Sequence, residues 1–227
     1  MKKIVILTGA GISAESGINT FRGSNGLWER HDIYEVASPE GWKRNPGLVL
    51  DFYNKRRAQL HEVVPNEAHF AISELSKSHH VHVITQNVDD LHERAGNPNI
   101  SHLHGELRKV RSELDQSYVI PFEGDLFLGD LCPKGHQLRP HIVWFGEAVP
   151  MIDEAIQIIH DSDEVWIIGT SMKVYPAAGL VSYAPPSSQI IYIDPNPQIN
   201  YELSRFNVRV VENTAAKATP FLVEQYL

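Results

Sequence analysis

The chain has 227 residues, of which 42% are hydrophobic and 21% charged, as is typical of a globular protein with one large domain, alone or with a small satellite. Its 28 acidic and 20 basic residues give a formal net charge of −8, so we expect no nucleic-acid partner, because no positive field attracts phosphates. Cys132 is the only cysteine, no apolar run approaches roughly 18 residues, and a strand-like run begins almost at the N-terminus; we therefore expect a cytoplasmic protein without a disulfide, membrane span or signal peptide.

The N-terminal region carries a glycine-rich turn. The apolar run Ile4 to Leu7 is followed by Thr8-Gly9-Ala10-Gly11-Ile12-Ser13-Ala14, which predicts a strand, a tight turn and the first residues of a helix. Gly9, Gly11 and Ala14 fit the spacing G-x-G-x-x-G/A, with which a bare backbone cradles a pyrophosphate at a helix N-terminus. An ordinary dinucleotide fold has an acidic strand end about 20 residues downstream. This chain continues with Asn19-Thr20-Phe21-Arg22-Gly23 instead.

The rest of the chain alternates between helical and strand-like segments. Ser38-Pro39 and Asn45-Pro46 predict helix starts. Further helices are expected over 67–75, 152–160 and near the C-terminus, and strands over 81–85, 100–103, 165–168, 190–193 and 208–211. This alternation predicts an α/β fold with a Rossmann-like, doubly wound parallel sheet. The acidic stretch 109–139 has little periodicity and predicts an excursion from that sheet.

Small or polar residues follow three of the predicted strands. They are Gly9-Ala10-Gly11, Gln86-Asn87 and Gly169-Thr170-Ser171. Open α/β sheets bind ligands at the carboxyl ends of their strands. We therefore expect the three strand ends to converge on one crevice.

Several longer blocks extend these motifs. They are Gly9 to Ile18 followed by Phe21-Arg22, Thr85-Gln86-Asn87-Val88-Asp89, His102-Leu103-His104-Gly105-Glu106-Leu107, His141 to Glu147, and Gly169-Thr170-Ser171 with Val174 and Pro176-Ala177. Together they resemble the signature of the sirtuins, the Sir2 family of NAD-dependent protein deacylases, over nearly the whole chain. The resemblance implies NAD as the co-substrate and acylated lysines of proteins or peptides as the substrate.

The resemblance also implies a domain organisation. Residues 1–30, 66–107 and 140–227 correspond to a Rossmann-like NAD-binding domain. A helical insertion over 31–65 and a zinc-less remnant of a zinc-ribbon module over 108–139 together form the small domain.

NAD-binding residues are implied in several parts of the chain. They are Gly9, Ala10, Gly11, Ile12 and Ala14 of the glycine turn, Phe21 and Arg22, which close over the cofactor, Gln86, Asn87 and Asp89 of the nicotinamide pocket, and Gly169, Thr170 and Ser171. Asp194 stands where the family usually has an asparagine that holds the adenosine ribose, and a carboxylate can still accept from ribose hydroxyls. Ala215 stands where the family contacts adenine. Read without the resemblance, 85–92 is a strand end with a helix cap, the role we expect for Asp90.

His104 is the expected catalytic base. The resemblance implies that its imidazole takes a proton from a ribose hydroxyl of NAD, while Asn87 orients that ribose. Imidazole suits this role because its unperturbed pKa near 6.5 leaves it free as a base at neutral pH. The chain holds 12 histidines, and an unplaced histidine is more often a surface or structural residue. We expect the structural role for His102.

Two features suggest the substrate. Val143, Phe145, Gly146 and Glu147 belong to a segment that resembles the edge against which sirtuins pair an extended peptide, although the same run also fits a core strand with a buried tryptophan. Tyr53 and Arg56 lie three residues apart, on one helix face. An arginine on a helix is ordinarily a solvated surface charge, but this pair resembles the sirtuins that remove succinyl and malonyl groups, and Ala37 matches a small residue of that class. We expect desuccinylation, with deacetylation retained.

The zinc module departs from the family. Sirtuins usually have two cysteine pairs here, whereas Ser112 stands near the first expected cysteine and only Cys132 remains, with His136 nearby. Two ligands do not make a tetrahedral zinc site, so we expect no structural zinc. The excursion is then expected to be held by ordinary packing of Leu114, Tyr118, Val119, Phe122, Leu126, Phe127 and Leu131.

The implied reaction yields free lysine, nicotinamide and O-acyl-ADP-ribose. Two alternatives remain at this point. One is a different NAD-consuming chemistry, either ADP-ribosyl transfer or NAD hydrolysis. The other is a non-catalytic sensor of NAD or acyl-lysine.

Overall fold

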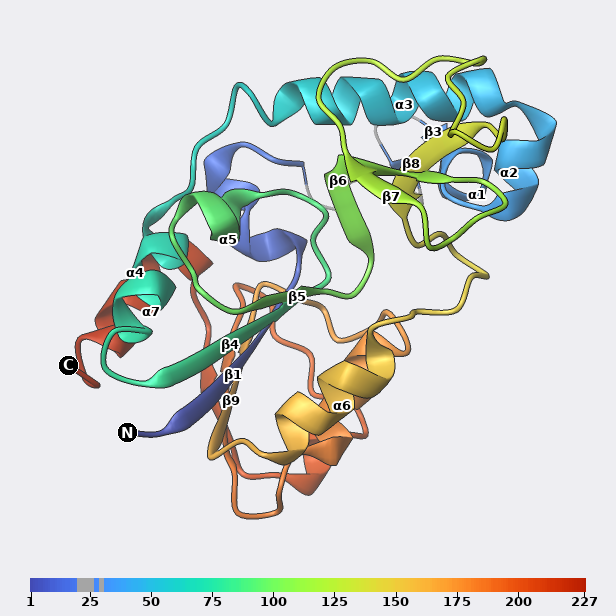
Figure 1. The fold of residues 1–227 in the computed structure, drawn as a ribbon. Helices are drawn as coiled ribbons and strands as arrows, with labels where there is room; N and C mark the ends of the chain where they lie inside the picture. The colour runs from blue at the N-terminus through green and yellow to red at the C-terminus, as the bar shows by residue number, and fades with distance from the viewer. Residues whose placement is uncertain (20–26, 29–30) are drawn as a thin grey trace.

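The structure is a computed structural model that describes residues 1–19, 27–28 and 31–227. Six parallel strands form the central sheet in the order β11-β10-β9-β1-β4-β5 (Figure 1). Their bounds are β1 Lys3–Thr8, β4 His80–Thr85, β5 Ile100–His102, β9 Glu164–Ile168, β10 Gln189–Ile193 and β11 Val208–Val211. The strand order reverses at β1, which lies between β4 and β9. The predicted α/β fold with a doubly wound parallel sheet is therefore confirmed.

Both faces of the sheet are covered. Ile4 and Ile6 of β1 pack with α4 (Glu67–Leu75) and α7 (Ala215–Val223), while Val5 and Leu7 pack with α6 (Ile152–His160) and a 3-10 helix over Ala177–Tyr183. Figure 1 shows α4 and α7 side by side on one face and α6 on the other. Because successive side chains of a strand point to opposite faces, a strand covered on both sides needs an unbroken apolar run.

The glycine turn after β1 differs from the expectation. The chain continues into two 3-10 helices, Ala10–Ile12 and Ala14–Ser16, and not into an α-helix. Gly17 ends the second one in the left-handed region, with φ 97°. A single turn of this kind has no extended row of aligned peptide dipoles. The predicted phosphate site at the N-terminus of an α-helix is therefore wrong in that detail.

Asparagine and serine caps set the helix starts that the sequence predicts. The Ser38 hydroxyl accepts from the amide of Gly41 at 2.9 Å at the start of α2 (Pro39–Arg44). Asn45 caps α3 (Pro46–Gln59) in the same way. These side chains satisfy amides that have no partner inside the helix.

A second group of elements lies beside the carboxyl ends of the sheet, at the top of Figure 1. It comprises β2 Leu27–Trp28, β3 His31–Asp32, α1 Ile33–Val36, α2, α3, and an antiparallel sheet of β6 Gly105–Ser112, β7 Val119–Pro121 and β8 Leu138–Ile142. Helices α1, α2 and α3 and the antiparallel sheet share one hydrophobic cluster, separate from the two that flank the central sheet. The short helix α5 (Leu91–Arg94) and 3-10 helix Leu203–Arg205 complete the described elements.

The packing of the excursion is only partly as predicted. Leu126 is fully buried, and Tyr118 and Phe122 pack against the same cluster. Leu114, Phe127 and Leu131 are exposed by 71%, 61% and 53%, so their predicted role in the core is wrong. Polar contacts to α3 hold the segment instead. The side chain of Asn54 accepts from the amide of Leu126 at 2.9 Å and donates to the carbonyl of the same residue at 3.0 Å.

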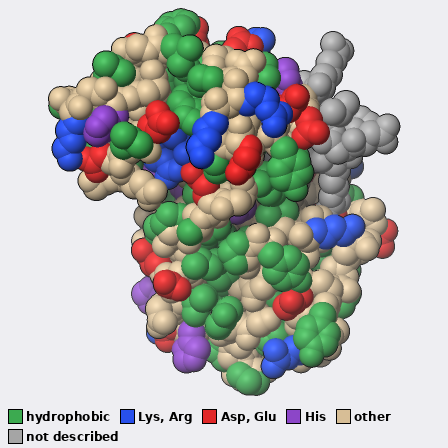
Figure 2. Space-filling view, turned by 90° about the vertical axis from the view of Figure 1, so that its right-hand side faces the viewer, with side chains coloured by type: hydrophobic (Ala, Val, Ile, Leu, Met, Phe, Trp, Pro, Cys, Tyr) green, Lys and Arg blue, Asp and Glu red, His purple; other side chains and the backbone are tan. Residues whose placement is uncertain are grey.

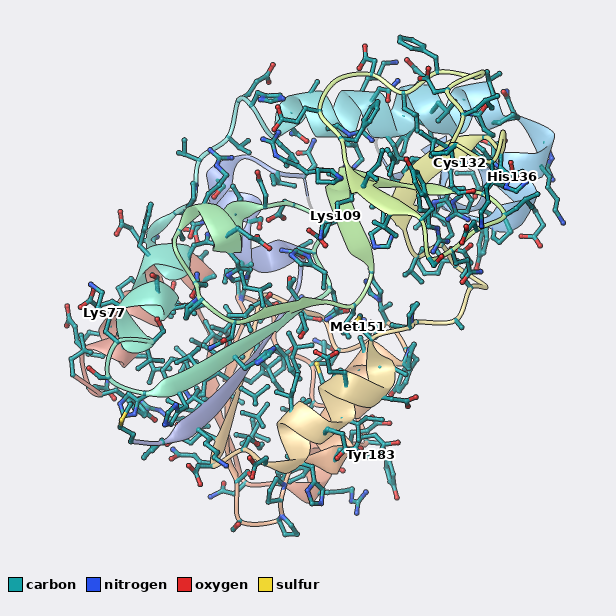
Figure 3. All side chains as sticks on the ribbon, viewed as in Figure 1. Lys77, Lys109, Cys132, His136, Met151 and Tyr183 are labelled. Atoms are coloured by element: carbon teal, nitrogen blue, oxygen red, sulfur yellow. The ribbon has the colours of Figure 1, made fainter. Side chains whose placement is uncertain are left out.

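Cys132 and His136 lie together at the outer end of this excursion (Figure 3). The amide of Cys132 donates to the carbonyl of His136 at 2.8 Å, which closes a tight turn. Within residues 1–19, 27–28 and 31–227, no helix is both long and apolar enough to cross a membrane.

Candidate active site

A cavity of about 470 Å³ lies between the carboxyl ends of the central strands and the elements beside them. Its walls come from the loops after β1, β4, β9 and β10, from α3, and from the segment after β8. The predicted site residues that line it are Gly9, Ala10, Gly11, Ala14, Ala37, Tyr53, Arg56, Gln86, Asn87, Asp89, His104, Val143, Phe145, Gly146, Glu147, Gly169, Thr170, Ser171 and Asp194. The predicted convergence of three strand ends on one crevice is therefore confirmed. Figure 2 shows hydrophobic side chains at the boundary between the second group of elements, at the top, and the part of the molecule that contains the central sheet, below.

Close packing between two loops explains the glycines. The amide of Gly11 donates to the carbonyl of Gly169 at 2.8 Å. A Cβ on Gly11 would lie 2.7 Å from the Gly169 backbone, and a Cβ on Gly9 would lie 2.7 Å from the Thr170 side chain. The loops after β1 and β9 thus approach more closely than side chains permit. They form a wall of backbone and methyl groups.

A chain of hydrogen bonds joins the amide-bearing loop to the glycine turn. The Asn87 side-chain amide donates to the Ser13 hydroxyl, and that hydroxyl donates to the Asp89 carboxylate, both at 3.1 Å. Asp89 is only 7% exposed, and burial raises the pKa of its carboxyl. The Gln86 amide donates to the Thr170 hydroxyl at 3.0 Å. These bonds fix the orientation of the Gln86 and Asn87 side chains at the cavity wall.

His104 is oriented as a base. Its Nδ1 lies 3.0 Å from the carbonyl oxygen of Gln86, which can only accept, so Nδ1 carries the proton. In the neutral ring Nε2 is then left with a lone pair. Burial lowers the pKa of His104, and the bond to Gln86 opposes this only in part. The imidazole is therefore neutral at pH 7 and able to accept a proton.

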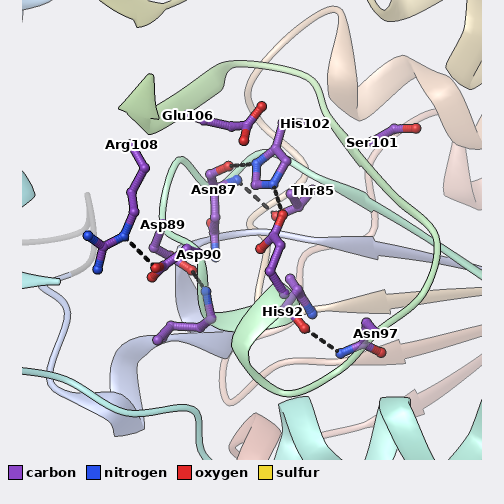
Figure 4. A network of polar contacts seen from close by, with 12 residues as sticks. Thr85, Asn87, Asp89, Asp90, His92, Asn97, Ser101, His102, Glu106 and Arg108 are labelled. Atoms are coloured by element: carbon purple, nitrogen blue, oxygen red, sulfur yellow. Dashed lines mark hydrogen bonds and ion pairs between the residues drawn. The ribbon is translucent and has the colours of Figure 1, made fainter. Parts of the chain in front are cut away.

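His102 has the structural role predicted for it (Figure 4). Its Nδ1 lies 3.0 Å from the carbonyl oxygen of Asn87, and its Nε2 lies 2.6 Å from the Glu93 carboxylate. Burial alone would lower the pKa of His102, but the bond to Glu93 outweighs it and the net pKa is raised. His102 thus braces the backbone of Asn87. Glu93, His102 and Glu106 each place one possible metal-ligand atom within 4.8 Å of the other two. Both ring nitrogens of His102 already have hydrogen-bond partners, however.

Asp90 does not act as the predicted cap. It stands at the N-cap position of α5, but its side chain makes no capping bond. Its carboxylate instead accepts from Arg108 Nε at 2.6 Å (Figure 4), and Asp89 Oδ1 accepts from the amide of Leu91 at 3.2 Å. A charged partner contributes more to a carboxylate than an amide does, which explains the exchange of roles.

Tyr53 and Arg56 line the cavity from α3. Tyr53 is fully buried and Arg56 is 6% exposed, so the reading of Arg56 as a solvated surface charge is wrong. The Tyr53 hydroxyl accepts from the Trp144 indole N–H at 3.1 Å. Burial raises the pKa of Tyr53 far above its ordinary value, so the phenol remains a donor. Ala37, 4% exposed, lines the same cavity with only a methyl group.

The segment 143–147 follows β8 and is not itself a strand. The amide of Val143 donates to the carbonyl of His104 at 2.9 Å, and the amide of Phe145 to that of Ala37 at 3.0 Å. The Glu147 carboxylate accepts from Arg139 at 2.7 Å and from Arg111 at 3.1 Å. The segment is therefore held between the expected base and the expected acyl-group residues.

Some predicted residues lie elsewhere. The Ile12 side chain is fully buried against the central sheet, and Ala215 is 3% exposed inside the same cluster, so neither side chain reaches the cavity. Phe21 and Arg22 fall outside the described residues. Sequence reasoning missed Trp144 and Thr214, which do line the cavity. Trp144 precedes the predicted residue Phe145, and Thr214 precedes the predicted residue Ala215. Their position beside predicted residues is the one sequence signal that could have found them.

The lining suits a dinucleotide. One wall offers the backbone of the glycine turn to phosphates, the hydroxyls of Thr170 and Ser171 and the carboxylate of Asp194 suit ribose, and the amides of Gln86 and Asn87 suit a carboxamide. The Cβ positions of Gly9 and Gly11 are already filled by the neighbouring loop, so this wall cannot accept larger residues.

Comparison with known proteins places this geometry in context. The Sir2 family profile matches residues 9–176. An NAD-dependent protein deacylase of Helicobacter pylori (strain ATCC 700392 / 26695) is 57% identical over all of this chain and 98% of its own. One of Bacteroides thetaiotaomicron is 53% identical over 87% of each chain. A solved Sir2 homologue in complex with NAD superposes with a TM-score of 0.87, at 38% identity, over 99% of this chain and 89% of that chain. A mutant Sir2 homologue with 2′-O-acetyl ADP-ribose gives 0.84 at 37% identity, over 98% and 90%.

Proposed function

The chain belongs to the Sir2 family and is an NAD-dependent protein deacylase, and we propose that it removes succinyl and malonyl groups from lysine, and acetyl groups as well. The proposed products are nicotinamide and O-acyl-ADP-ribose. A Sir2 homologue of known structure holds 2′-O-acetyl ADP-ribose, which supports this product class.

One observation carries the acyl preference. Arg56 and Tyr53 are both buried in the wall of the cavity that also contains His104. A guanidinium offers a planar fork to a carboxylate, and a phenol adds one more donor. The carboxylate of an acidic acyl group is an anion whose geometry matches this fork, whereas an acetyl group offers no charge to it. The small Ala37 leaves room for the longer acyl chain.

His104 is the proposed base of the reaction. Its Nε2 takes the proton of a ribose hydroxyl while Nδ1–H remains bonded to the Gln86 carbonyl, which holds the ring in place as charge develops. Asn87 is the proposed ribose-orienting residue, because Ser13 and the His102-braced backbone fix its amide. NAD, when bound, would supply the electrophilic ribose carbon, and His104 and Asn87 are the side chains of this chain that act on its ribose.

The remaining assignments are proposals of the same kind. NAD is bound by the cavity-lining residues given above together with Phe21 and Arg22, with Asp194 at the adenosine ribose. Val143, Phe145, Gly146 and Glu147 flank the acyl-lysine peptide. Because Glu147 is bonded to two arginines, its contribution to the peptide comes from the backbone. Residues 31–65 and 108–139 act as a small domain without structural zinc.

An acyl-peptide panel tests the acyl preference. Succinyl-lysine, malonyl-lysine and acetyl-lysine forms of one peptide are assayed with NAD, and O-acyl-ADP-ribose is quantified by mass spectrometry. We expect Arg56→Met to lower kcat/KM for the succinyl peptide by roughly 10- to 100-fold, the value of a charge-assisted hydrogen bond, and for the acetyl peptide by less than about threefold.

Two controls frame this result. Arg44→Met removes an exposed arginine from α2 and is expected to change neither activity. His104→Ala is expected to abolish product formation from every peptide. An equal loss on succinyl and acetyl peptides in Arg56→Met would refute the acyl assignment, and ADP-ribosylated protein in place of O-acyl-ADP-ribose would refute the proposed products.

A further inference from the structure

The Tyr53 hydroxyl has a partner from a distant part of the chain. Trp144, 91 residues away in sequence, donates its indole N–H to the phenol oxygen at 3.1 Å. Both side chains are buried, Tyr53 fully and Trp144 to 2% exposure. A phenol oxygen accepts in the plane of its ring and donates its own proton in another direction. The indole therefore restricts where the Tyr53 proton can point.

Trp144 is itself held on several sides. The guanidinium carbon of Arg139 lies 3.3 Å from the centroid of its ring, and the Trp42 ring packs at 5.7 Å. Its backbone amide donates to the Glu147 carboxylate at 2.8 Å. A cation in contact with the face of an aromatic ring fixes the ring plane. The direction of the indole N–H is thus determined by Arg139 and Glu147.

Arg139 is held just as firmly. It donates to the two carboxylate oxygens of Glu147 at 2.7 and 3.1 Å, and to the carbonyl of Ile142 at 2.9 Å. Arg111 donates to the same carboxylate. Burial would raise the pKa of Glu147, but Arg139 and the other donors outweigh it and the net pKa is lowered. Glu147 therefore stays ionised, and one carboxylate is shared by two guanidinium groups.

We propose that Trp144 and Arg139 are positioning residues for acyl selectivity, which hold the Tyr53 hydroxyl so that its proton is directed to the carboxylate of an acidic acyl group. The inference rests on the proposed acyl preference. Neither residue needs to touch the substrate carboxylate. With two guanidinium groups on one carboxylate, the cluster also carries one excess positive charge behind Tyr53, which favours an anionic over a neutral acyl group.

The contact is more specific than core packing requires. A buried phenylalanine at 144 would fill most of the same volume and leave no N–H to satisfy. A buried tryptophan needs an acceptor for its indole N–H. Here that acceptor is a cavity-lining hydroxyl. That choice links the Arg139–Glu147 pair to the acyl site.

A double-mutant cycle tests this inference. The measured quantity is the ratio of kcat/KM for succinyl-lysine and acetyl-lysine forms of one peptide. We expect Trp144→Phe to lower this ratio by roughly three- to tenfold, the net value of one hydrogen bond, mainly through KM for the succinyl peptide. In a Tyr53→Phe background the same substitution should leave the ratio unchanged, because no hydroxyl remains to be positioned.

Matched controls separate positioning from packing. Trp166→Phe removes another buried indole N–H, which bonds Glu164 at 2.9 Å and belongs to a residue outside the cavity lining, and it is expected to leave the ratio unchanged. Arg139→Lys keeps the charge but loses the fork and the ring contact, so it should lower the ratio in the same direction. This second variant decides the question if Trp144→Phe does not fold.

The outcomes are distinguishable. If the wild type prefers succinyl-lysine and loses this preference in Arg56→Met, but Trp144→Phe and Arg139→Lys keep it, the positioning role is refuted and the proposed function stands. An equal drop from Trp144→Phe with and without the Tyr53 hydroxyl refutes it as well. A wild type without succinyl activity refutes the acyl preference and this inference together.

Discussion

Arg57 is expected to stabilise the contact between α3 and the excursion. It is 1% exposed and joins three separate parts of the chain. Its Nε donates to the carbonyl of Leu107 at 2.7 Å, and its Nη1 donates to the carbonyl of Gly124 and to the side-chain oxygen of Asn54, both at 3.0 Å. Asn54 in turn binds the backbone of Leu126. Arg57 and Asn54 thus tie β6 and the excursion to α3.

The expected effect of Arg57→Met follows from these contacts. Three hydrogen bonds to a charged group contribute about 1.5–3 kcal/mol each. Against this, burial lowers the pKa of Arg57 from 12.5 to about 10, so removing the cation returns on the order of 3 kcal/mol. The net loss in the free energy of unfolding is then roughly 1.5–6 kcal/mol. Methionine keeps most of the side-chain volume, so little of this comes from a cavity.

Urea unfolding followed by tryptophan fluorescence measures this change. Lys55→Met, on the same helix but with a side chain 71% exposed, is the matched control. We expect it to alter the free energy of unfolding by less than about 0.5 kcal/mol. A loss below about 1 kcal/mol in Arg57→Met would show that the apolar cluster alone holds the excursion, and would refute this reasoning.

Three further predictions concern protons and metal. Because burial lowers the pKa of His104, the acid limb of kcat/KM against pH should have its midpoint below about 6.5; a midpoint at or above that value contradicts the assignment of His104 as base. Burial lowers the pKa of His69 to about 4 in the folded protein. As the pH falls, this histidine is therefore protonated in the unfolded chain before it is protonated in the folded one. The free energy of unfolding should drop for this reason by about 2 kcal/mol between pH 7 and pH 5. Urea unfolding of His69→Gln should lack that share of the pH dependence, and an unchanged slope speaks against it. Finally, EDTA and Cys132→Ala should each change the free energy of unfolding by less than about 1.5 kcal/mol, against roughly 10 kcal/mol for a structural zinc site, and stoichiometric zinc by elemental analysis would overturn the zinc-less assignment.

Local patterns in the sequence predicted most of the secondary structure. The helix over 67–75 and the strand over 208–211 have the predicted bounds, because hydrophobic periodicity and capping residues act within a few positions of each other. The glycine turn failed at this level. Its residues fit a helix start, but Gly17 in the left-handed region ends the helical turn after Ser16.

The candidate site was predicted less evenly. Strand ends meet at one edge of a parallel sheet, so the convergence of Gly9, Gln86 and Gly169 followed from the order of elements alone. The side chains of Ile12 and Ala215 pack in the core, which the motifs did not indicate, because the direction of one side chain depends on the packing of the whole turn. A motif locates a backbone segment more accurately than the orientation of each of its side chains.

By itself, the sequence determined the family, the parallel sheet and the loop that carries His104, since each depends on residues close together in the chain. Only the tertiary structure decided that Arg56 is buried, that Glu147 pairs with two arginines, and that Asn54 holds the excursion. Those contacts join residues as far apart as Tyr53 and Trp144. Such pairs form only when separate elements pack, because burial is a property of the assembled core and not of any one segment.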